Sequence, residues 1–391
     1  MKKEINTLFV LLKCAVFGDD LCDGAKKEAA EKASLLFDMA RHHDLAHLLD
    51  FAYKKSGIAV DDNDTAYKFV RYQALSVMRY ENLNLALENV SAILEEEKIP
   101  FIPLKGAVIK NLYPEPWMRT SCDIDILVHE EDIGRAEQAI CEKLGYTSNG
   151  ERGYHDISLY SDTDVHLELH FNIKENMENI DILLEKVWEF ALPETEGSYE
   201  QLLTNEFLLF QHVAHMSYHV IGGGCSVRYF MDLFLLENKL EFDKTIFGKM
   251  LEECGLVKFY KAISKLARVW FADESHDDVT LSLQKYILFG GIYGTKVNSI
   301  AVNDEKKSTV AYVADRIFMP YEKLCITYPY LKGRKYLLPF YQVKRWCRTL
   351  KNHRYASASE ELKANRGVSE DRIHEFSGLL TELELNKTAK K

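Results

Sequence analysis

The stretch DIDILV at residues 123–128 decides the fold. Acidic and β-branched residues alternate in it before an apolar run, which is typical of a strand with one buried face. Asp123 and Asp125 then project from one face of the strand, while Ile124 and Ile126 enter a core. A helix would turn the two carboxylates about 200° apart. The pair can therefore form half of a divalent-metal site only on a strand.

A second strand pattern, DVHLELHF at residues 164–171, offers more polar groups. With a period of two, one of its faces carries Asp164, His166, Glu168 and His170. A hard cation with oxygen ligands needs a third carboxylate. We prefer Glu168 for this role and keep Asp164 as the substitute. The two stand about 13 Å apart on an extended strand, so only one can join the aspartates around the same ions.

A transition-metal site is a rival interpretation of the same strand. His166, Glu168 and His170 are residue types that bind zinc or iron. The two imidazoles, however, lie about 13 Å apart along an extended chain. One ion cannot be bound by both without a bulge, so this interpretation ranks below the carboxylate cluster.

Short motifs surround these two strands and continue beyond them. In the core they are Pro103-Leu-Lys-Gly-Ala107, Tyr113, Pro114, Pro116, Arg119, Cys122-Asp-Ile-Asp-Ile-Leu-Val128, Leu144-Gly-Tyr146 and Leu167-Glu-Leu-His-Phe171. Further along they are His212, His215, Met231-Asp-Leu233, Tyr330-Leu-Lys332 and Leu338-Pro339. With these motifs the chain resembles the uncharacterised nucleotidyltransferase family of the DNA polymerase β-like nucleotidyltransferase superfamily. The specific motifs are confined to residues 102–173.

The resemblance implies a reaction and its metal ions. Asp123, Asp125 and Glu168 would bind two Mg²⁺ ions, with Mn²⁺ as an alternative. The enzyme would transfer a nucleoside monophosphate from an NTP, ATP being the first candidate, to a small-molecule or protein acceptor. Glu168 is placed to draw a proton from that acceptor as well.

The resemblance also points to the residues that hold the nucleotide. Lys105 and Gly106 stand where other superfamily members have a Gly-Ser turn around the phosphates, and Gly106 permits close backbone approach to an anion. The hydroxyl of that turn is missing, so Ser121 or Thr120 is the candidate to supply it. Arg119 either contacts phosphate or pairs with the surrounding carboxylates.

The altered Lys-Gly turn leaves a second class of function open, a catalytically weak or inactive binding or regulatory module with the same fold. Retention of three carboxylates counts against it, because uncompensated like charges are costly to keep together. For the same reason we expect that neutralising Asp123 or Asp125 holds or raises the stability of the metal-free protein.

Composition bears on the partners and the cellular compartment of the protein. The chain has 391 residues and a net charge of −11, which disfavours tight nonspecific binding to nucleic acid. No apolar stretch approaches the roughly 20 residues that span a bilayer, and the N-terminus reads as a first helix rather than a signal peptide. The eight cysteines show no C-x-x-C or zinc spacing, which favours a reducing cytoplasm.

We expect an α+β fold in three regions. A helical region at 1–97 precedes a nucleotidyltransferase-like core at 98–178, and a second helical region covers 179–391. The core is a small mixed sheet with helices on one side. Its strands are expected at 99–104, 123–128, 154–160 and 164–172, and its helix at 133–144 should end at a left-handed Gly145. Pro100 and Pro103 make the first strand short or place it at an edge.

The second helical region contains two polar features, each with two alternative roles. His212, His215 and His219 share one face of a helix, where they contact substrate or phosphate or form a packed polar stripe; we prefer the stripe. Asp232 lies in an apolar helix and needs a partner. Arg228 or a histidine would supply one, and a catalytic role is the alternative.

Overall fold

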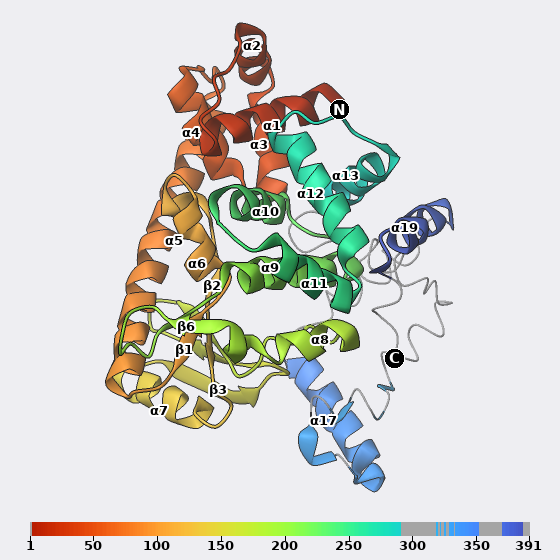
Figure 1. Ribbon diagram of the computed structural model, residues 1–391. Helices are drawn as coiled ribbons and strands as arrows, with labels where there is room; N and C mark the ends of the chain where they lie inside the picture. The colour runs from red at the N-terminus through yellow and green to blue at the C-terminus, as the bar shows by residue number, and fades with distance from the viewer. Residues whose placement is uncertain are drawn as a thin grey trace.

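The Asp-x-Asp strand belongs to a five-stranded mixed sheet (Figure 1). The strands are β1 (Phe101–Pro103), β2 (Asp123–Val128), β3 (Thr147–Arg152), β4 (Asp156–Tyr160) and β5 (His166–His170), in the order β1-β2-β5-β4-β3. β2 and β5 run parallel, and the other neighbours are antiparallel. The computed structural model describes residues 2–290, 318–319, 321, 324–325, 328–331, 333–351 and 370–385.

All four expected strands are present, with ends that differ by a few residues. β1 lies at an edge of the sheet, as its prolines predict. β3 is a strand that we did not predict. Its sequence, TSNGER, has no apolar alternation, and it pairs with β4 across an irregular register. Tertiary pairing therefore decides its conformation rather than local pattern.

Two helices close the apolar face of the sheet. Ile124, Ile126 and Val128 of β2 are buried in a core shared with α5 (Asn63–Glu96) and α7 (Ile133–Leu144). Gly145 ends α7 with a φ of 72°, which confirms the predicted cap. The 34 residues of α5 give it a length of about 50 Å. Figure 1 shows α5 running along one side of the molecule from the N-terminal helices to the sheet.

The opposite face of β2, with the two aspartates, is turned toward a body of helices. This body is built from α1 (Lys2–Val16), α2 (Asp23–Glu31), α3 (Ala33–His42), α4 (Ala46–Ser56), α9 (Asn205–Ile221), α10 (Val227–Lys239), α11 (Lys244–Cys254), α12 (Val257–Phe271) and α13 (Asp278–Gly290). Its early and late helices share one apolar core. Phe9 of α1 stacks on Trp270 of α12 with ring centroids 4.5 Å apart. Figure 1 shows α1 and α12 side by side.

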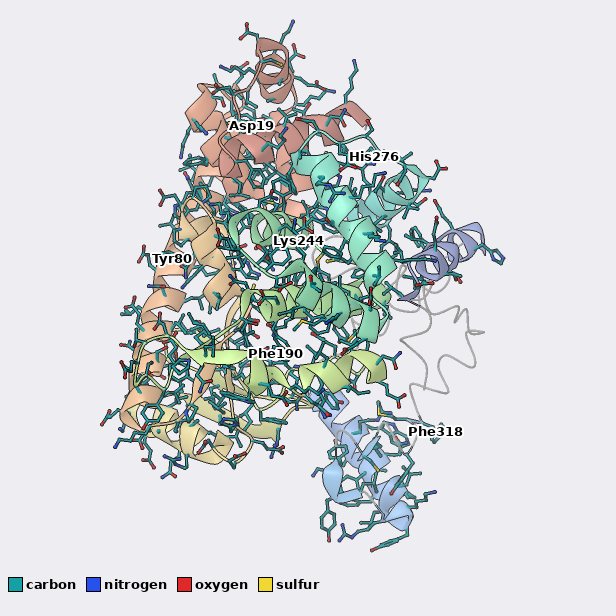
Figure 2. The ribbon with its side chains drawn as sticks, viewed as in Figure 1. Asp19, Tyr80, Phe190, Lys244, His276 and Phe318 are labelled. Carbon is teal, nitrogen blue, oxygen red and sulfur yellow. The ribbon has the colours of Figure 1, made fainter. Side chains whose placement is uncertain are left out.

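Residues after 178 are not wholly helical, contrary to our expectation. After α8 (Glu178–Leu184) and a 3-10 turn at Val187–Phe190, the short strands β6 (Ala191–Pro193) and β7 (Gln201–Leu203) form an antiparallel pair. Phe190, labelled in Figure 2, stacks on Phe207 of α9 at 4.7 Å and fixes the hairpin to the helical body. The remaining described α-helices are α6 (Gly106–Ile109), α17 (Leu338–Lys351) and α19 (Glu370–Glu382). The region boundaries at 97/98 and 178/179 stay predictions.

Two further sequence expectations concern apolar helices and cysteines. Within the described ranges, none of the helices combines the length and apolarity that a bilayer crossing needs. The cysteines whose side chains are described, which exclude Cys347, are free thiols.

Candidate active site

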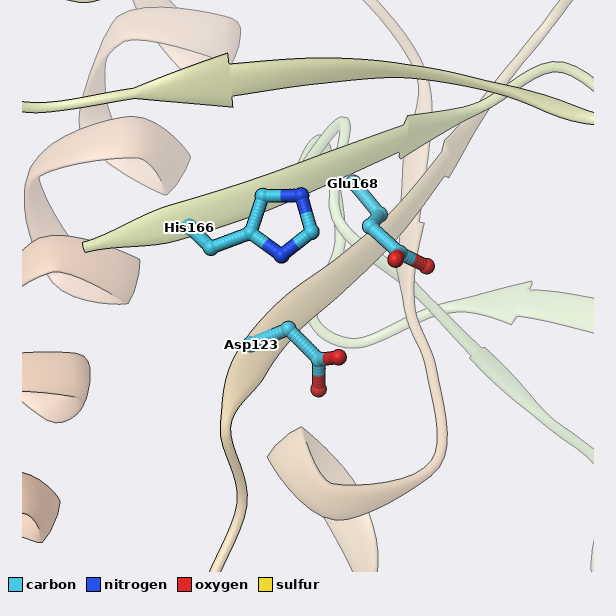
Figure 3. A group of neighbouring side chains, drawn as sticks. All are labelled: Asp123, His166 and Glu168. Atoms are coloured by element: carbon cyan, nitrogen blue, oxygen red, sulfur yellow. The ribbon is translucent and has the colours of Figure 1, made fainter. Parts of the chain in front are cut away.

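The parallel pairing of β2 and β5 brings the acidic residues of both strands together. Asp123 lies opposite His166, and Asp125 lies opposite Glu168. Figure 3 shows Asp123 projecting from β2 on the same side of the sheet as His166 and Glu168 of the neighbouring strand. The strand register thus places Glu168 beside the Asp-x-Asp pair.

The side chains form two overlapping groups of candidate metal ligands. One consists of Asp123, His166 and Glu168, and the other of Asp125, Glu168 and His170; the ligand atoms in each lie within 4.8 Å of one another. Glu168 belongs to both groups. Asp164 belongs to neither, because it lies in the turn before β5 with a φ of 59°.

This arrangement bears on the two interpretations of the second strand. It places Glu168 beside Asp123 in one group and beside Asp125 in the other, and it leaves out the substitute. The two histidines fall in different groups, so no single group holds the His166, Glu168 and His170 set.

Asp125 is held by two basic side chains. Lys105 Nζ donates to its Oδ1 at 2.7 Å, and His170 Nε2 lies 2.9 Å from the same oxygen. Burial would raise the pKa of Asp125, but Lys105 and His170 outweigh it and hold the pKa well below its ordinary value. Asp125 is therefore an ionised carboxylate with its charge already compensated.

Asp123 is in the opposite electrostatic condition. Burial raises the pKa of its carboxyl, and the nearby charges of Asp125 and Glu168 raise it further. The Ser121 hydroxyl donates to its Oδ1 at 3.4 Å. Glu168, by contrast, has a lowered pKa, because the His170 ring donates to it at 3.4 Å. A cation at Asp123 would relieve the repulsion there.

The turn at Lys105 and Gly106 is shaped by neighbouring side chains. A Cβ at residue 106 would lie 2.5 Å from Arg119 Nη1 and 2.9 Å from Ser121 Oγ. The positive φ of the turn, 46°, falls on Lys105 instead. Gly106 therefore makes room for Arg119 and Ser121, and its expected contact with phosphate stays a proposal.

Arg119 pairs with a carboxylate, though not with one on β2 or β5. Its Nη2 donates to Asp232 Oδ2 at 3.0 Å, and Tyr113 Oη donates to Asp232 Oδ1 at 2.7 Å. Burial would raise the pKa of Asp232, but the Arg119 charge outweighs it and the pKa is lowered. Arg119 is the partner that Asp232 requires, in place of Arg228 or a histidine. The pair joins the segment that precedes β2 to α10.

Thr120, one of the two candidates to replace the hydroxyl of the Gly-Ser turn, bonds to residues away from the carboxylates. Thr120 Oγ1 donates to Asp44 Oδ2 at 2.8 Å and accepts from Arg228 Nη1 at 3.2 Å. Thr120 is buried, whereas Ser121 is half-buried beside Asp123. Of the two hydroxyls, Ser121 is the one that faces the carboxylates.

A cavity of about 310 Å³ separates the acidic face of the sheet from α9 and α10. Its sheet side includes Asp123, Asp125 and His170, and its helical side includes His215 and Tyr229. The volume lies at the lower end of the range of small-molecule sites. The cavity thus joins the candidate metal ligands to the helical body.

The three histidines of α9 line this cavity, and His212 and His219 also contact Tyr229 of α10, so the preferred stripe between helices stays a prediction. His212 Nε2 lies 2.9 Å from the backbone oxygen of Tyr229 and fixes α9 to α10. His215 and His219 instead contact Glu175 and the Tyr229 hydroxyl. We did not single out Glu175, because it lies in a segment without periodic pattern and its partner His215 is forty residues away.

A mixed sheet with an Asp-x-Asp strand, a third carboxylate on its parallel neighbour and helices around it is an α+β fold of the nucleotidyltransferase class. The profile of a family described as uncharacterised nucleotidyltransferase matches residues 29–272, and the chain belongs to that family. The match ends before the tail motifs at 330–339, in which Lys332 is outside the described residues. No curated protein matches the chain.

Proposed function

We propose that this protein transfers a nucleoside monophosphate from an NTP, with ATP as the first candidate, to a small-molecule or protein acceptor. The observation that carries the proposal is the β2–β5 register, which places Glu168 beside Asp123 and Asp125, the two aspartates that line the cavity. The family membership supports the class of reaction. A cytoplasmic location and the absence of tight nonspecific nucleic-acid binding are part of the proposal.

The donor set fits Mg²⁺, with Mn²⁺ as the alternative. Carboxylate oxygens are the ligands that these hard cations prefer. The raised pKa of Asp123 reflects burial and uncompensated negative charge, which a bound cation would offset. We assign Asp123, Asp125 and Glu168 as the ligands. When bound, the ions would supply Lewis-acid stabilisation of the charge that develops on the triphosphate and acceptor oxygens.

The chain's own residues would position the reactants. Glu168 is half-buried with an ionised carboxylate and is able to accept the proton of an acceptor hydroxyl. Lys105 presents an amine beside Asp125, where it also balances charge next to a triphosphate. Ser121 offers the hydroxyl nearest to Asp123. Arg119 is a positioning residue in this scheme, because Asp232 holds its guanidinium under the Gly106 turn.

One observation favours a second candidate, a catalytically weak binding or regulatory module. Lys105 and His170 both contact Oδ1 of Asp125, so the negative charge of this carboxylate is compensated without a metal ion. A metal ion would have to displace these contacts or use the other oxygen. The two candidates share nucleotide binding and differ in turnover.

Transfer of an α-phosphate label tests the proposal directly. Full-length protein is incubated with each α-labelled NTP, Mg²⁺ or Mn²⁺, and fractionated small-molecule and protein acceptors; label transfer and pyrophosphate release are then measured. We expect both products with the parent protein and with Asp164→Asn, whose carboxylate lies outside the cluster. Asp123→Asn should abolish both. Thermal stabilisation by Mg²⁺ and NTP without any transfer would overturn the proposed transferase activity and support the binding or regulatory module.

A further inference from the structure

A triangle of polar atoms lies on the helical wall of the cavity, away from the carboxylates. His215 Nε2 lies 3.0 Å from His219 Nε2, and the Tyr229 hydroxyl lies 3.4 Å and 3.2 Å from these two atoms. The histidines are one helical turn apart on α9, and Tyr229 comes from α10. All three side chains line the cavity.

Glu175 fixes the ring of His215 from behind. Its Oε1 lies 2.6 Å from His215 Nδ1, and an ionised carboxylate can only accept, so Nδ1 carries the proton. The opposite ring nitrogen of His215, Nε2, faces the triangle. Metal-binding histidines commonly have such a carboxylate on the other ring nitrogen.

The second imidazole presents the same ring nitrogen to the triangle. His219 Nε2 lies 3.0 Å from His215 Nε2 and 3.2 Å from the Tyr229 hydroxyl. Imidazole binds a metal ion through the lone pair of a neutral ring, so a bound ion would replace the hydrogen bonds among these three groups.

We propose that His215 and His219 bind a transition-metal ion of the Zn²⁺ class, with Tyr229 as the third polar neighbour and Glu175 as the residue that orients His215. A tetrahedral ion with ligands at about 2.05 Å separates them by about 3.3 Å, and an octahedral one by about 2.9 Å. The three sides of the triangle, 3.0, 3.2 and 3.4 Å, span these values. The site goes beyond the proposed transferase reaction.

The chemistry of this site differs from that of the carboxylate cluster across the cavity. Imidazoles suit zinc-like ions, whereas Asp123, Asp125 and Glu168 suit Mg²⁺ or Mn²⁺. An ion held by neutral ligands keeps most of its positive charge, and only Glu175 partly balances it. The helical wall would then attract an anionic group of a bound molecule.

Cobalt binding tests the site without depending on nucleotide transfer. Co²⁺ is titrated into chelator-stripped full-length protein with excess Mg²⁺, and visible absorption reports binding. The titration uses a Glu168→Gln parent, because Glu168 is shared by both groups of candidate ligands on the sheet. We expect one equivalent of Co²⁺ to bind and Zn²⁺ to displace it.

Variants in the same parent identify the ligands. His215→Ala and His219→Ala should each weaken Co²⁺ binding by more than about 100-fold, and Glu175→Gln by about 10- to 100-fold. His42→Ala, which removes an exposed imidazole on α3, is the matched control and should bind as the parent does. Circular dichroism verifies folding. No Co²⁺ binding by the parent, or equal affinity after both histidine changes, would overturn the site and leave only a hydrogen-bonded imidazole pair.

Discussion

The two aspartates of β2 should respond in opposite ways to the same substitution in metal-free buffer. Asp125→Asn removes the charge that compensates Lys105 and His170, whose donors lie 2.7 and 2.9 Å from its Oδ1. Asp123→Asn removes a carboxylate whose pKa is raised by burial and by Asp125 and Glu168. The structure thus revises the sequence-based expectation that either change holds or raises stability.

The size of the Asp125 effect follows from its surroundings. Removing one partner of a buried ion pair costs about 3 to 5 kcal/mol. The side chains of Asp125 and His170 are 5% and 3% exposed, whereas that of Lys105 is 30% exposed and recovers part of its hydration. We therefore expect Asp125→Asn to lower the free energy of unfolding by about 3 kcal/mol. Asp123→Asn should leave it unchanged or raise it.

Thermal and urea unfolding in chelator at neutral pH measure the two effects. The order of midpoints should be Asp123→Asn at or above the parent protein, and Asp125→Asn clearly below. A double variant, Asp125→Asn with Lys105→Met, should recover part of the loss, because the half-buried amine is removed with its partner. Equal midpoints for the two single variants would refute the proposed charge compensation at Asp125.

Three further effects can be measured. Glu168→Gln should lower metal-dependent transfer by about 100-fold or more, while Asp164→Asn costs little; the reverse pattern in initial rates would contradict the Glu168 assignment. Gly106→Ala should displace Arg119, lower stability by about 1 to 3 kcal/mol and weaken NTP binding more than Mg²⁺ binding in calorimetry, and equal NTP affinity would remove the turn from the site. Burial lowers the pKa of His170, but its carboxylate neighbours raise it above 6.5. The contribution of His170 to the free energy of unfolding is therefore complete below pH 6.5 and is lost as pH rises through the raised pKa. Urea unfolding should show that this free energy declines over the same pH range, and His170→Gln should flatten the decline.

Local pattern was enough to predict the parts of the fold that have strong periodicity. The alternation at 123–128 predicts β2, and the apolar spacing before Gly145 predicts α7 and its cap. The same reasoning missed β3, whose polar sequence becomes a strand only through pairing with β4. The β6–β7 pair was missed for the same reason.

The site was predictable where its residues lie on predicted strands. Period two along β2 and β5 is sufficient to place Asp123, Asp125 and Glu168 on like faces, and family resemblance selects Glu168. The partner of Asp232 was not predictable, because Arg119 lies 113 residues away and several cations were equally plausible in sequence. Contacts across such separations depend on the packing of α10 against the segment before β2, which no local signal encodes.

The contact between Phe9 and Trp270 has a consequence for biosynthesis. The same helices are joined by an ion pair, in which Lys13 Nζ lies 2.6 Å from Asp273 Oδ2 just after α12. During vectorial synthesis the sheet segment emerges before α12, so the apolar surface of α1 that packs on α12 stays uncovered until α12 has emerged from the ribosome. Long-range closure of this kind slows folding and prolongs exposure to chaperones and to aggregation. Codon-dependent pauses between the sheet and α12 would lengthen that interval most.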